Sequence, residues 1–316
     1  MSMVADNEIL GRERELEVIR SYIHAPRVLR VLLMWGPVGS GRSFLIRHIL
    51  RTERNALRVF LDLSPAPKHL RIPGVHEIEE CRRSTEECVA ASVHEGLDKA
   101  DGREERVIIA VDGVMCEEPG EKCKLPLLVR SLARLIEVHS TKLRIIMSVD
   151  DLEATLLLGT VAEYIRPLVV GGLDPDSAAE FVKREAAKAG LSLSNEEVAN
   201  IVGATGGLPY AMLVVIHEYR GDVEKWMRDM TFKTRWKLTL ISTLTGRPVR
   251  EVAKDILDMH GRQVITLPRT AYEVLRAALK TNLVYVDEYS VVRLQLPIYR
   301  GILHSIAYGG PLPRLG

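Results

Sequence analysis

The chain has 316 residues, of which 47% are hydrophobic and 27% charged, and its formal net charge is +1. This composition is ordinary for a globular protein, and the length allows one large core or two to three domains. No apolar run is long enough to span a membrane, and the N-terminus lacks a signal-peptide pattern. The sequence therefore predicts a cytoplasmic protein without a membrane partner.

Charge is unevenly distributed along the chain. Residues 222–316 contain 15 Lys and Arg against 9 Asp and Glu, whereas the preceding part contains 28 against 33. A basic C-terminal third fits a polyanionic partner, and it fits a well-solvated surface equally well. Only two Gln and five Asn occur. Few thermolabile amides among many charges indicate a heat-loving source.

Five short apolar runs predict strands that are buried on both faces of a parallel sheet. They are Val28–Trp35, Leu57–Leu63, Val107–Asp112, Leu143–Val149 and Leu168–Gly171. Helices are expected between them at Ser43–Arg51, Glu77–Asp98 and Pro126–Val138. This alternation predicts a three-layer α/β core. The proline-rich segment Leu63–Gly74 is expected to form a surface loop.

The pattern becomes helical after residue 172. Asp174 or Asp176 can cap a first helix that ends at Gly190, and Ser194 with Glu197 forms a capping box for a second. The further expected helices are Ser194–Val202, Leu208–Arg220 and Val223–Lys237. The last part predicts two helices, a hairpin and a final helix, which is the order of a winged helix-turn-helix. These elements are Val249–Met259, Thr270–Lys280, Leu283–Val286, Val291–Leu296 and Ile298–Ile306.

The stretch "GPVGSGRS" between the first strand and the first helix resembles a phosphate-binding loop. Glycines let backbone N–H groups crowd a phosphate chain, and the following helix N-terminus adds partial positive charge. The loop needs a hydroxyl for Mg²⁺, and Ser43 supplies it. The strand–loop–helix setting favours a nucleotide site over a structural turn. The loop residues are Gly36, Pro37, Val38, Gly39, Ser40, Gly41, Arg42, Ser43 and Phe44.

Arg42 stands where the pattern requires lysine. Arginine keeps the charge and can bind phosphate with two hydrogen bonds, but its planar fork differs in shape from a compact ammonium group. Arg42 thus alters the cation that stabilises the negative charge as it shifts during phosphoryl transfer. We expect affinity for ATP or ADP to survive and turnover to fall.

Asp112 ends an apolar strand in "RVIIAVDG", where a carboxylate can order Mg²⁺. Many ATPases carry a water-activating glutamate next, but here the next residue is Gly113. Glu117 and Glu118 are alternative bases, although as loop residues they are more typical of solvated charges. Ser148 ends the following strand in "LRIIMSVDD". It is expected either to sense the γ-phosphate or to be a plain strand-terminal serine.

The four cysteines form two pairs of equal spacing, Cys81 with Cys88 and Cys116 with Cys123. The spacing is wider than zinc ribbons use. A helical segment between Cys81 and Cys88 would separate their Cα atoms by about 10 Å, too far for a disulfide. Buried free thiols are the favoured interpretation, and cross-pairing between the two segments is the alternative.

Most of the chain resembles archaeal ATPases of the STAND/AAA+ superfamily. The resemblance lies in "ILGREREL" before the loop, the loop itself, Asp112, Ser148 and "TGGLPYAM", and origin-recognition ATPases share "GRERE". It implies a P-loop sheet in the order 5-1-4-3-2, a helical lid and a C-terminal winged helix. The implied domains are residues 1–172, 173–237 and 238–316.

The resemblance also assigns residues to the nucleotide. Leu10, Gly11 and Arg12 border the adenine, and Pro209 of the lid touches the nucleotide. The chain departs from the family at Arg42, Gly113 and Asp150, the last of which stands where signalling relatives often have arginine. All three departures concern the γ-phosphate. They favour a slow ATP-dependent switch that uses Mg²⁺, with a hydrolysis-deficient adaptor that binds protein partners as the alternative.

A third interpretation is an origin-recognition-like protein that binds double-stranded DNA. The second helix of a winged helix usually reads DNA, and here it offers Arg269, Arg276 and Lys280. The "FKTRWKL" stretch adds Lys233, Arg235 and Lys237, whereas Asp287 and Glu288 at the wing tip would repel phosphate. Packing on the ATPase core or binding of a protein is the alternative role of this domain.

Overall fold

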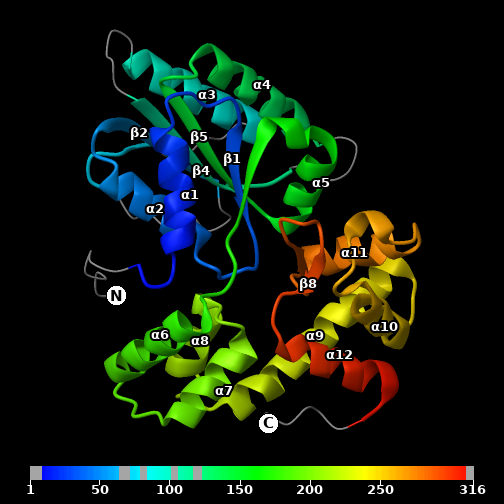
Figure 1. Cartoon of the computed structure of the whole chain (residues 1–316). Helices are drawn as coiled ribbons and strands as arrows, with labels where there is room; N and C mark the ends of the chain where they lie inside the picture. Colours follow the sequence, from blue (N-terminus) through cyan, green and yellow to red (C-terminus); the bar gives the residue numbers. More distant parts are fainter. Residues whose placement is uncertain (1–8, 64–71, 79–83, 101–105, 117–122, 311–316) are drawn as a thin grey trace. The chain divides into compact units, whose positions relative to one another are not determined.

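The computed structural model describes residues 9–63, 72–78, 84–100, 106–116 and 123–310 (Figure 1). By their contacts, residues 14–35 and 41–170 form one compact unit, and residues 1–13, 36–40 and 171–316 form the other. The two units are described separately. In the described ranges, no helix combines the length and the apolar character that crossing a bilayer requires.

The first unit contains a six-stranded parallel sheet with strand order β3-β2-β4-β5-β1-β6. Both β1 and β5 are buried along their whole length, as expected for continuous apolar runs covered on both faces. The parallel α/β core predicted from the sequence is therefore confirmed. The strands are β1 (Val31–Trp35), β2 (Ala56–Asp62), β3 (His76–Ile78), β4 (Arg106–Val114), β5 (Leu143–Val149) and β6 (Ile165–Val169).

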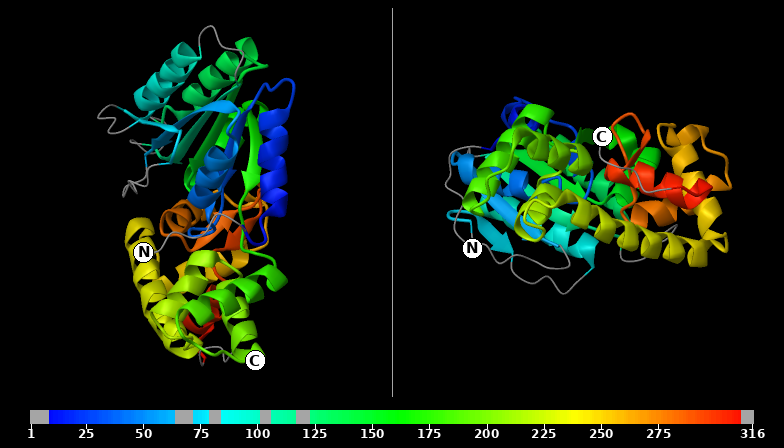
Figure 2. Two further views of the ribbon diagram at one scale, coloured as in Figure 1. Left: turned by 90° about the vertical axis from the view of Figure 1, so that its left-hand side faces the viewer. Right: turned by 90° about the horizontal axis from the view of Figure 1, so that it is seen from below.

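Helices cover both faces of this sheet. Figure 2, left, shows α1 and α2 on one side and α3 and α4 on the other, and α5 contacts α4 and β1. A 3₁₀ turn at Ala162–Tyr164 leads into β6. The helices are α1 (Glu13–His24), α2 (Arg42–Thr52), α3 (Thr85–Lys99), α4 (Leu125–Val138) and α5 (Asp151–Val161).

The expected helix Glu77–Asp98 was wrong at its N-terminal end. His76–Ile78 is an edge strand that pairs with β2, and α3 begins at Thr85 behind a capping box of Ser84 and Glu87. Pairing with a distant strand decides the conformation of β3, and local periodicity does not report such pairing. Most of the expected loop Leu63–Gly74 lies outside the described residues.

A buried arginine fastens α1 to the sheet. Arg144 of β5 is fully buried, and its guanidinium donates to the carbonyls of Tyr22, Ile23 and Ser140 at 3.0–3.2 Å. Two of these acceptors belong to the last turn of α1, where carbonyls lack partners within the helix. The hydroxyl of Tyr22 donates to Ile145 at 3.0 Å, and burial raises the pKa of this phenol to about 12.

The second unit is mostly helical. Helix α9 runs without a break through residues 237 and 238, where the sequence suggested a boundary, and it ends at Gly246 in the left-handed conformation. The elements are α6 (Pro175–Lys188), α7 (Asn195–Thr205), α8 (Pro209–His217), α9 (Val223–Thr245), α10 (Val249–Met259), a 3₁₀ turn (Val264–Thr266), α11 (Ala271–Lys280), β7 (Val284–Val286), β8 (Val292–Leu294) and α12 (Ile298–Tyr308).

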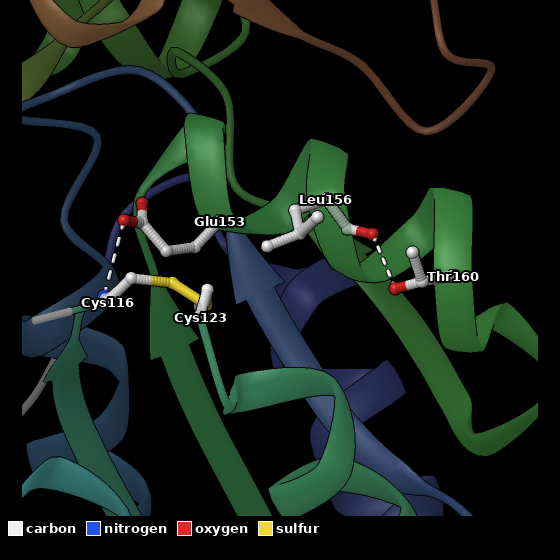
Figure 3. Close-up of a disulfide and its surroundings, with 5 residues drawn as sticks. All are labelled: Cys116, Cys123, Glu153, Leu156 and Thr160. Atoms are coloured by element: carbon white, nitrogen blue, oxygen red, sulfur yellow. Dashed lines mark hydrogen bonds between the residues drawn. A yellow bond between two sulfur atoms is a disulfide. The ribbon is translucent and has the colours of Figure 1, made fainter. Parts of the chain in front are cut away.

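The interpretation of the cysteines as free thiols was wrong. Cys116 and Cys123 form a disulfide with their Cα atoms 5.5 Å apart, Cys88 is also disulfide-bonded, and no described cysteine is free. Cys116 lies in the segment after β4 and Cys123 just before α4 (Figure 3). Cys81 lies outside the described residues.

Lys237 of α9 is directed into its own unit. Its ammonium donates to the Asn282 carbonyl at 3.0 Å and to the Tyr299 hydroxyl at 3.3 Å, and it lies 5.4 Å from the centre of the Tyr299 ring. Burial, with a smaller contribution from the charge of Lys233, lowers the pKa of Lys237 to about 8. The expected place of Lys237 beside a nucleic-acid backbone is therefore wrong.

The pKa of Lys237 predicts a pH-dependent stability. Between pH 8 and the ordinary lysine pKa of 10.5, the unfolded chain binds a proton that the folded chain has released, so stability rises with pH. Relative to Lys237→Met, the wild-type free energy of unfolding should rise across this window by roughly 3 kcal/mol, since a tenfold change in proton affinity is about 1.36 kcal/mol. Urea unfolding at pH 7–11 measures this difference. The exposed Lys233→Met variant is the control, and parallel profiles for Lys237→Met would contradict the assignment.

The Cys116–Cys123 disulfide predicts a defined thiol pattern. In denaturant without reductant, alkylation followed by mass spectrometry should leave both cysteines of the wild type unmodified, whereas Cys116→Ser should expose Cys123 to one label. Loss of this cross-link should lower the free energy of unfolding by about 2 kcal/mol, because the unfolded chain regains loop entropy. Labelling of both cysteines in the wild type would show that the bond does not form.

Candidate functional site

The glycine loop between β1 and α2 has the backbone that crowding a ligand requires. Gly36, Gly39 and Gly41 have φ values of 136°, 84° and 99°, a region that side chains disfavour. A Cβ on Gly39 would lie 2.5 Å from Tyr210, so a second constraint acts at this position. Ser40 is buried, and its N–H donates to the Pro37 carbonyl at 3.1 Å. The loop is thus a compact turn that only glycines permit.

The N-terminus of α2 follows this loop directly. Its N-cap is Gly41, no side chain caps it, and the first turn of this fully described helix contains no acidic residue. Helix N-termini carry N–H groups without intrahelical partners and partial positive charge, so they attract anions. Arg42, Ser43 and Phe44 occupy this turn, with Ser43 and Phe44 exposed. This end of α2 has the properties of a phosphate-binding terminus.

Asp112 and Ser148 lie at the carboxyl ends of two neighbouring strands. Ser148 of β5 is paired with Met34 of β1, two residues before the loop, and Asp112 lies in β4, which pairs with β5. Both side chains are buried, with 3% and 4% exposure. Parallel pairing therefore places both polar groups at the edge of the sheet from which the loop departs.

Gly113 has a structural reason to be glycine. Its φ is +75°, and the β4–β5 register shifts between Val111 and Val114, so the strand bulges directly after Asp112. A glutamate at this position would be forced into the left-handed region. The alternative bases Glu117 and Glu118 lie outside the described residues.

The oxygen donors of the first unit fit a magnesium ion by their chemistry. Mg²⁺ prefers carboxylate and hydroxyl oxygens and retains several waters. The Asp112 carboxylate at the end of β4 and the Ser43 hydroxyl in the first turn of α2 are such donors. No nitrogen or sulfur ligand is needed, so these two residues would hold Mg²⁺ together with phosphate oxygens.

The Arg42 guanidinium is bound at the end of β5. It donates to the Val149 carbonyl and approaches the Asp150 carboxylate at 3.4 Å, and its side chain is only 13% exposed. Sequence reasoning identified Arg42 and Asp150 as separate departures from a pattern. The structure brings them together as an ion pair.

Residues 10–12 border the loop in the second unit. The buried Arg12 guanidinium donates to the Ser40 carbonyl at 2.6 Å and to the Gly171 carbonyl at 2.8 Å. Gly11 has φ +66°, and a Cβ there would lie 2.5 Å from Ser177. Leu10 is half-buried. Arg12 thus ties this segment to the phosphate loop through backbone carbonyls.

Two contacts of the loop were not anticipated from the sequence. The Val38 N–H donates to Oε1 of Gln295 at 3.0 Å, and the Gly39 carbonyl accepts from the Tyr210 N–H at 3.2 Å. Tyr210 follows Pro209, which begins α8. No local pattern marks Gln295, because its partner lies 257 residues away. The only sequence feature that distinguishes Gln295 is that glutamine is rare in this chain.

The close approach of "TGGLP" explains its glycines. The Leu173 N–H donates to the Gly207 carbonyl at 2.9 Å. A Cβ on Gly207 would lie 2.4 Å from the Leu173 carbonyl oxygen, and Gly206 and Gly207 have φ values of +62° and +70°. This turn directs α8, with Pro209 in its first turn, toward Gly39.

Three basic residues of the C-terminal part that the sequence singled out are exposed. Arg269 precedes α11, and Arg276 and Lys280 lie on the exposed side of α11 together with Glu273. Asp287 is buried, so it is not the exposed wing-tip charge that the sequence suggested. Its carboxylate accepts from the Tyr289 and Val291 N–H groups and from the Arg293 guanidinium at 2.9–3.0 Å. Asp287 therefore organises the β7–β8 turn with its charge balanced.

Comparison with known proteins shows a likeness in fold to a Walker-type ATPase. No protein-family model and no curated protein match the chain. The Walker-type ATPase paby2304 of Pyrococcus abyssi superposes with a TM-score of 0.59 at 19% identity, covering 94% of this chain and 96% of that chain. The likeness shows that the chain has the fold of this ATPase.

More distant matches are a Holliday junction branch migration motor and a replication initiator. RuvB of Thermotoga maritima has a TM-score of 0.44 at 15% identity, over 90% of this chain and 92% of that chain. AMPPCP-bound DnaA from Aquifex aeolicus has a TM-score of 0.41 at 14% identity, over 88% and 85%.

Proposed function

We propose that the chain is an ATP-binding P-loop NTPase of the STAND/AAA+ kind that acts as a slow nucleotide-dependent switch. One observation carries the proposal. A loop with three left-handed glycines leads into an uncapped helix N-terminus. Ser148 lies near the end of β5, the strand beside the one that precedes the loop, and Asp112 lies near the end of β4, the next strand in the sheet. Phosphate binding explains why glycines, an uncapped helix and buried polar side chains occur together.

Each residue then has a role that follows from its chemistry. Backbone N–H groups of the loop glycines and of the first turn of α2 bind the phosphates, and Ser43 and Asp112 hold Mg²⁺, which neutralises charge on the β- and γ-phosphates when bound. Ser148 senses the γ-phosphate or orients the attacking water. Leu10 and Gly11 border the adenine, and Arg12 fixes the shape of that segment. Pro209 starts the helix that contacts the nucleotide.

Slow hydrolysis follows from the γ-phosphate end of the site. Arg42 is engaged by Val149 and Asp150, and the residue after Asp112 is a left-handed glycine that cannot supply a general base. Nucleotide binding relies on the loop backbone, which the substitutions at positions 42 and 113 leave intact. Turnover relies on a cation that is free to move and on a general base. The ion pair restrains the cation, and Gly113 supplies no base.

Two contacts of the second unit support coupling between nucleotide and the C-terminal part. Gln295, next to β8, accepts from Val38, and Tyr210 of α8 donates to Gly39. Both partners are loop residues whose backbone would respond to a phosphate. We divide the chain into a nucleotide domain (1–172), a helical lid (173–237) and a winged-helix domain (238–316), and the continuous helix α9 runs through the boundary between the last two. The position of the lid and winged helix is the output of the switch.

Nucleotide binding and turnover test this function directly. Calorimetry should show Mg²⁺-dependent binding of ATP and ADP, and Asp112→Asn should weaken ATP binding by about tenfold, because each 1.4 kcal/mol of lost contact is a factor of ten. In single-turnover assays Arg42→Lys should hydrolyse ATP faster than the wild type by about tenfold. Asp98→Asn, an exposed carboxylate on α3, is the control. An unchanged hydrolysis rate in Arg42→Lys would refute the role of Arg42 in slowing turnover. If both the wild type and Arg42→Lys bind ATP but hydrolyse none, the result would favour the adaptor function.

Binding of double-stranded DNA is a second proposed function. Exposure of Arg269, Arg276 and Lys280 around one helix favours it, together with the order of α10, α11 and the β7–β8 hairpin. An exposed carboxylate at position 287 would repel DNA phosphates, but the charge of Asp287 is balanced by Arg293. In this proposal α11 enters the major groove and the three cations contact phosphates.

Salt-dependent DNA binding tests the second function. Replacing Arg269, Arg276 and Lys280 together by alanine should abolish retention on duplex DNA at moderate salt, and it should flatten the slope of log affinity against log salt by about 2–3. A matched variant replaces Lys183, Lys225 and Arg228, three exposed cations of the same unit. If both triple variants lost the same amount of DNA binding, net charge alone would explain the effect. That result would contradict a DNA-binding surface at Arg269, Arg276 and Lys280.

A further inference from the structure

Asp150 occupies a helix N-cap position without capping the helix. Its backbone has φ −80° and ψ 165°, and no side-chain cap hydrogen bond forms at α5. Asp174 and Asp222 hold the same position at α6 and α9, and each accepts from a first-turn N–H group. Aspartate is among the best N-cap residues. The Asp150 carboxylate is therefore used elsewhere.

That carboxylate faces Arg42 of the phosphate loop. The guanidinium lies 3.4 Å from Asp150 Oδ1, with the arginine side chain 13% exposed and the aspartate side chain 53% exposed. Ion pairs with such exposure contribute little to stability. An ion pair this weak holds the Arg42 guanidinium when no other anion is present, and it breaks when a competing anion binds the guanidinium.

We propose that Asp150 is a positioning residue that holds Arg42 at the end of β5 until a γ-phosphate competes for the guanidinium, which sets the preference of the site between ATP and ADP. This inference rests on the proposed nucleotide function. ATP must break the Arg42–Asp150 pair to gain the cation, so the pair weakens ATP binding. ADP lacks the competing group and leaves the pair intact.

Release of Asp150 has a consequence for α5. A carboxylate freed from Arg42 can accept from the first-turn N–H groups of α5, and such a cap stabilises a helix end. In the same turn, Glu153 accepts the Cys116 N–H at 3.4 Å (Figure 3). Cys116 follows the strand that bears Asp112. The exchange of partners at Asp150 thus links the cation of the loop to the segment beyond the magnesium ligand.

A double-mutant cycle on the full chain tests the proposal. Affinities for the non-hydrolysable analogue AMPPCP and for ADP, each with Mg²⁺, are measured for wild type, Asp150→Asn, Arg42→Met and the double variant. Asparagine keeps the size of the side chain and its capping ability. Asp150→Asn should tighten AMPPCP binding about two- to fivefold, the range of an exposed ion pair, and leave ADP binding unchanged. In the Arg42→Met background the same substitution should have no effect.

Each other outcome overturns the proposal. Equal tightening in both backgrounds would show that Asp150 only repels phosphate, and equal tightening for ADP and AMPPCP would show that it sets no preference. Glu137→Gln, an exposed carboxylate on α4, controls for net charge. Intact binding with no effect of Asp150→Asn refutes this inference alone, whereas no binding in any protein refutes the proposed function and this inference together.

Hydrogen exchange supplies a second measurement. Wild-type protein with AMPPCP should show greater protection of the first-turn amides of α5 than the ADP form, and Asp150→Ala, which cannot cap, should lose this difference. Asp150→Asn should show high protection with either nucleotide, because its amide is free to cap. Identical protection in all forms would refute the exchange of partners.

Discussion

Parallel strand pairing is the constraint on which the candidate site depends. All strands of a parallel sheet end at one edge, so the loop after β1, Ser148 of β5 and Asp112 of β4 start from the same edge of the structure. The central strands β1 and β5 are buried along their whole length, and most of their side chains are apolar. Polar chemistry is thus confined to the strand ends. The fully buried Arg144 serves this framework, because its donors satisfy the carbonyls at the end of α1.

The three departures at the γ-phosphate end form one local arrangement. Arg42 and Asp150 are partners, so the change in the loop and the change after Ser148 meet in one ion pair. Gly113 is required by a bulge with left-handed φ, so a water-activating carboxylate cannot stand there without backbone strain. Under the proposed function, such a site would retain the backbone cradle for phosphate and restrain the groups that move charge during transfer.

Loop residues 36–40 bind other parts of the second unit, to which they belong. Arg12 binds the Ser40 carbonyl, Tyr210 donates to Gly39, and Gln295 accepts from Val38. These contacts come from the N-terminal segment, the helical part and the C-terminal hairpin. The loop backbone therefore contacts three segments of its own unit that lie far apart in sequence.

The amino-acid sequence by itself determined the elements with strong local signals. Apolar runs marked the five main strands, glycine spacing marked the phosphate loop, and capping residues marked α6 and α7, because each signal is created by neighbours along the chain. Tertiary structure alone decided the edge strand β3, the length of α9, the Cys116–Cys123 bond and the partners of Arg42, Lys237, Asp287 and Gln295. The physical reason is that these features depend on burial and on hydrogen bonds between residues far apart in sequence. The local sequence pattern does not predict which distant group will bind a guanidinium, an ammonium group or the edge of a strand.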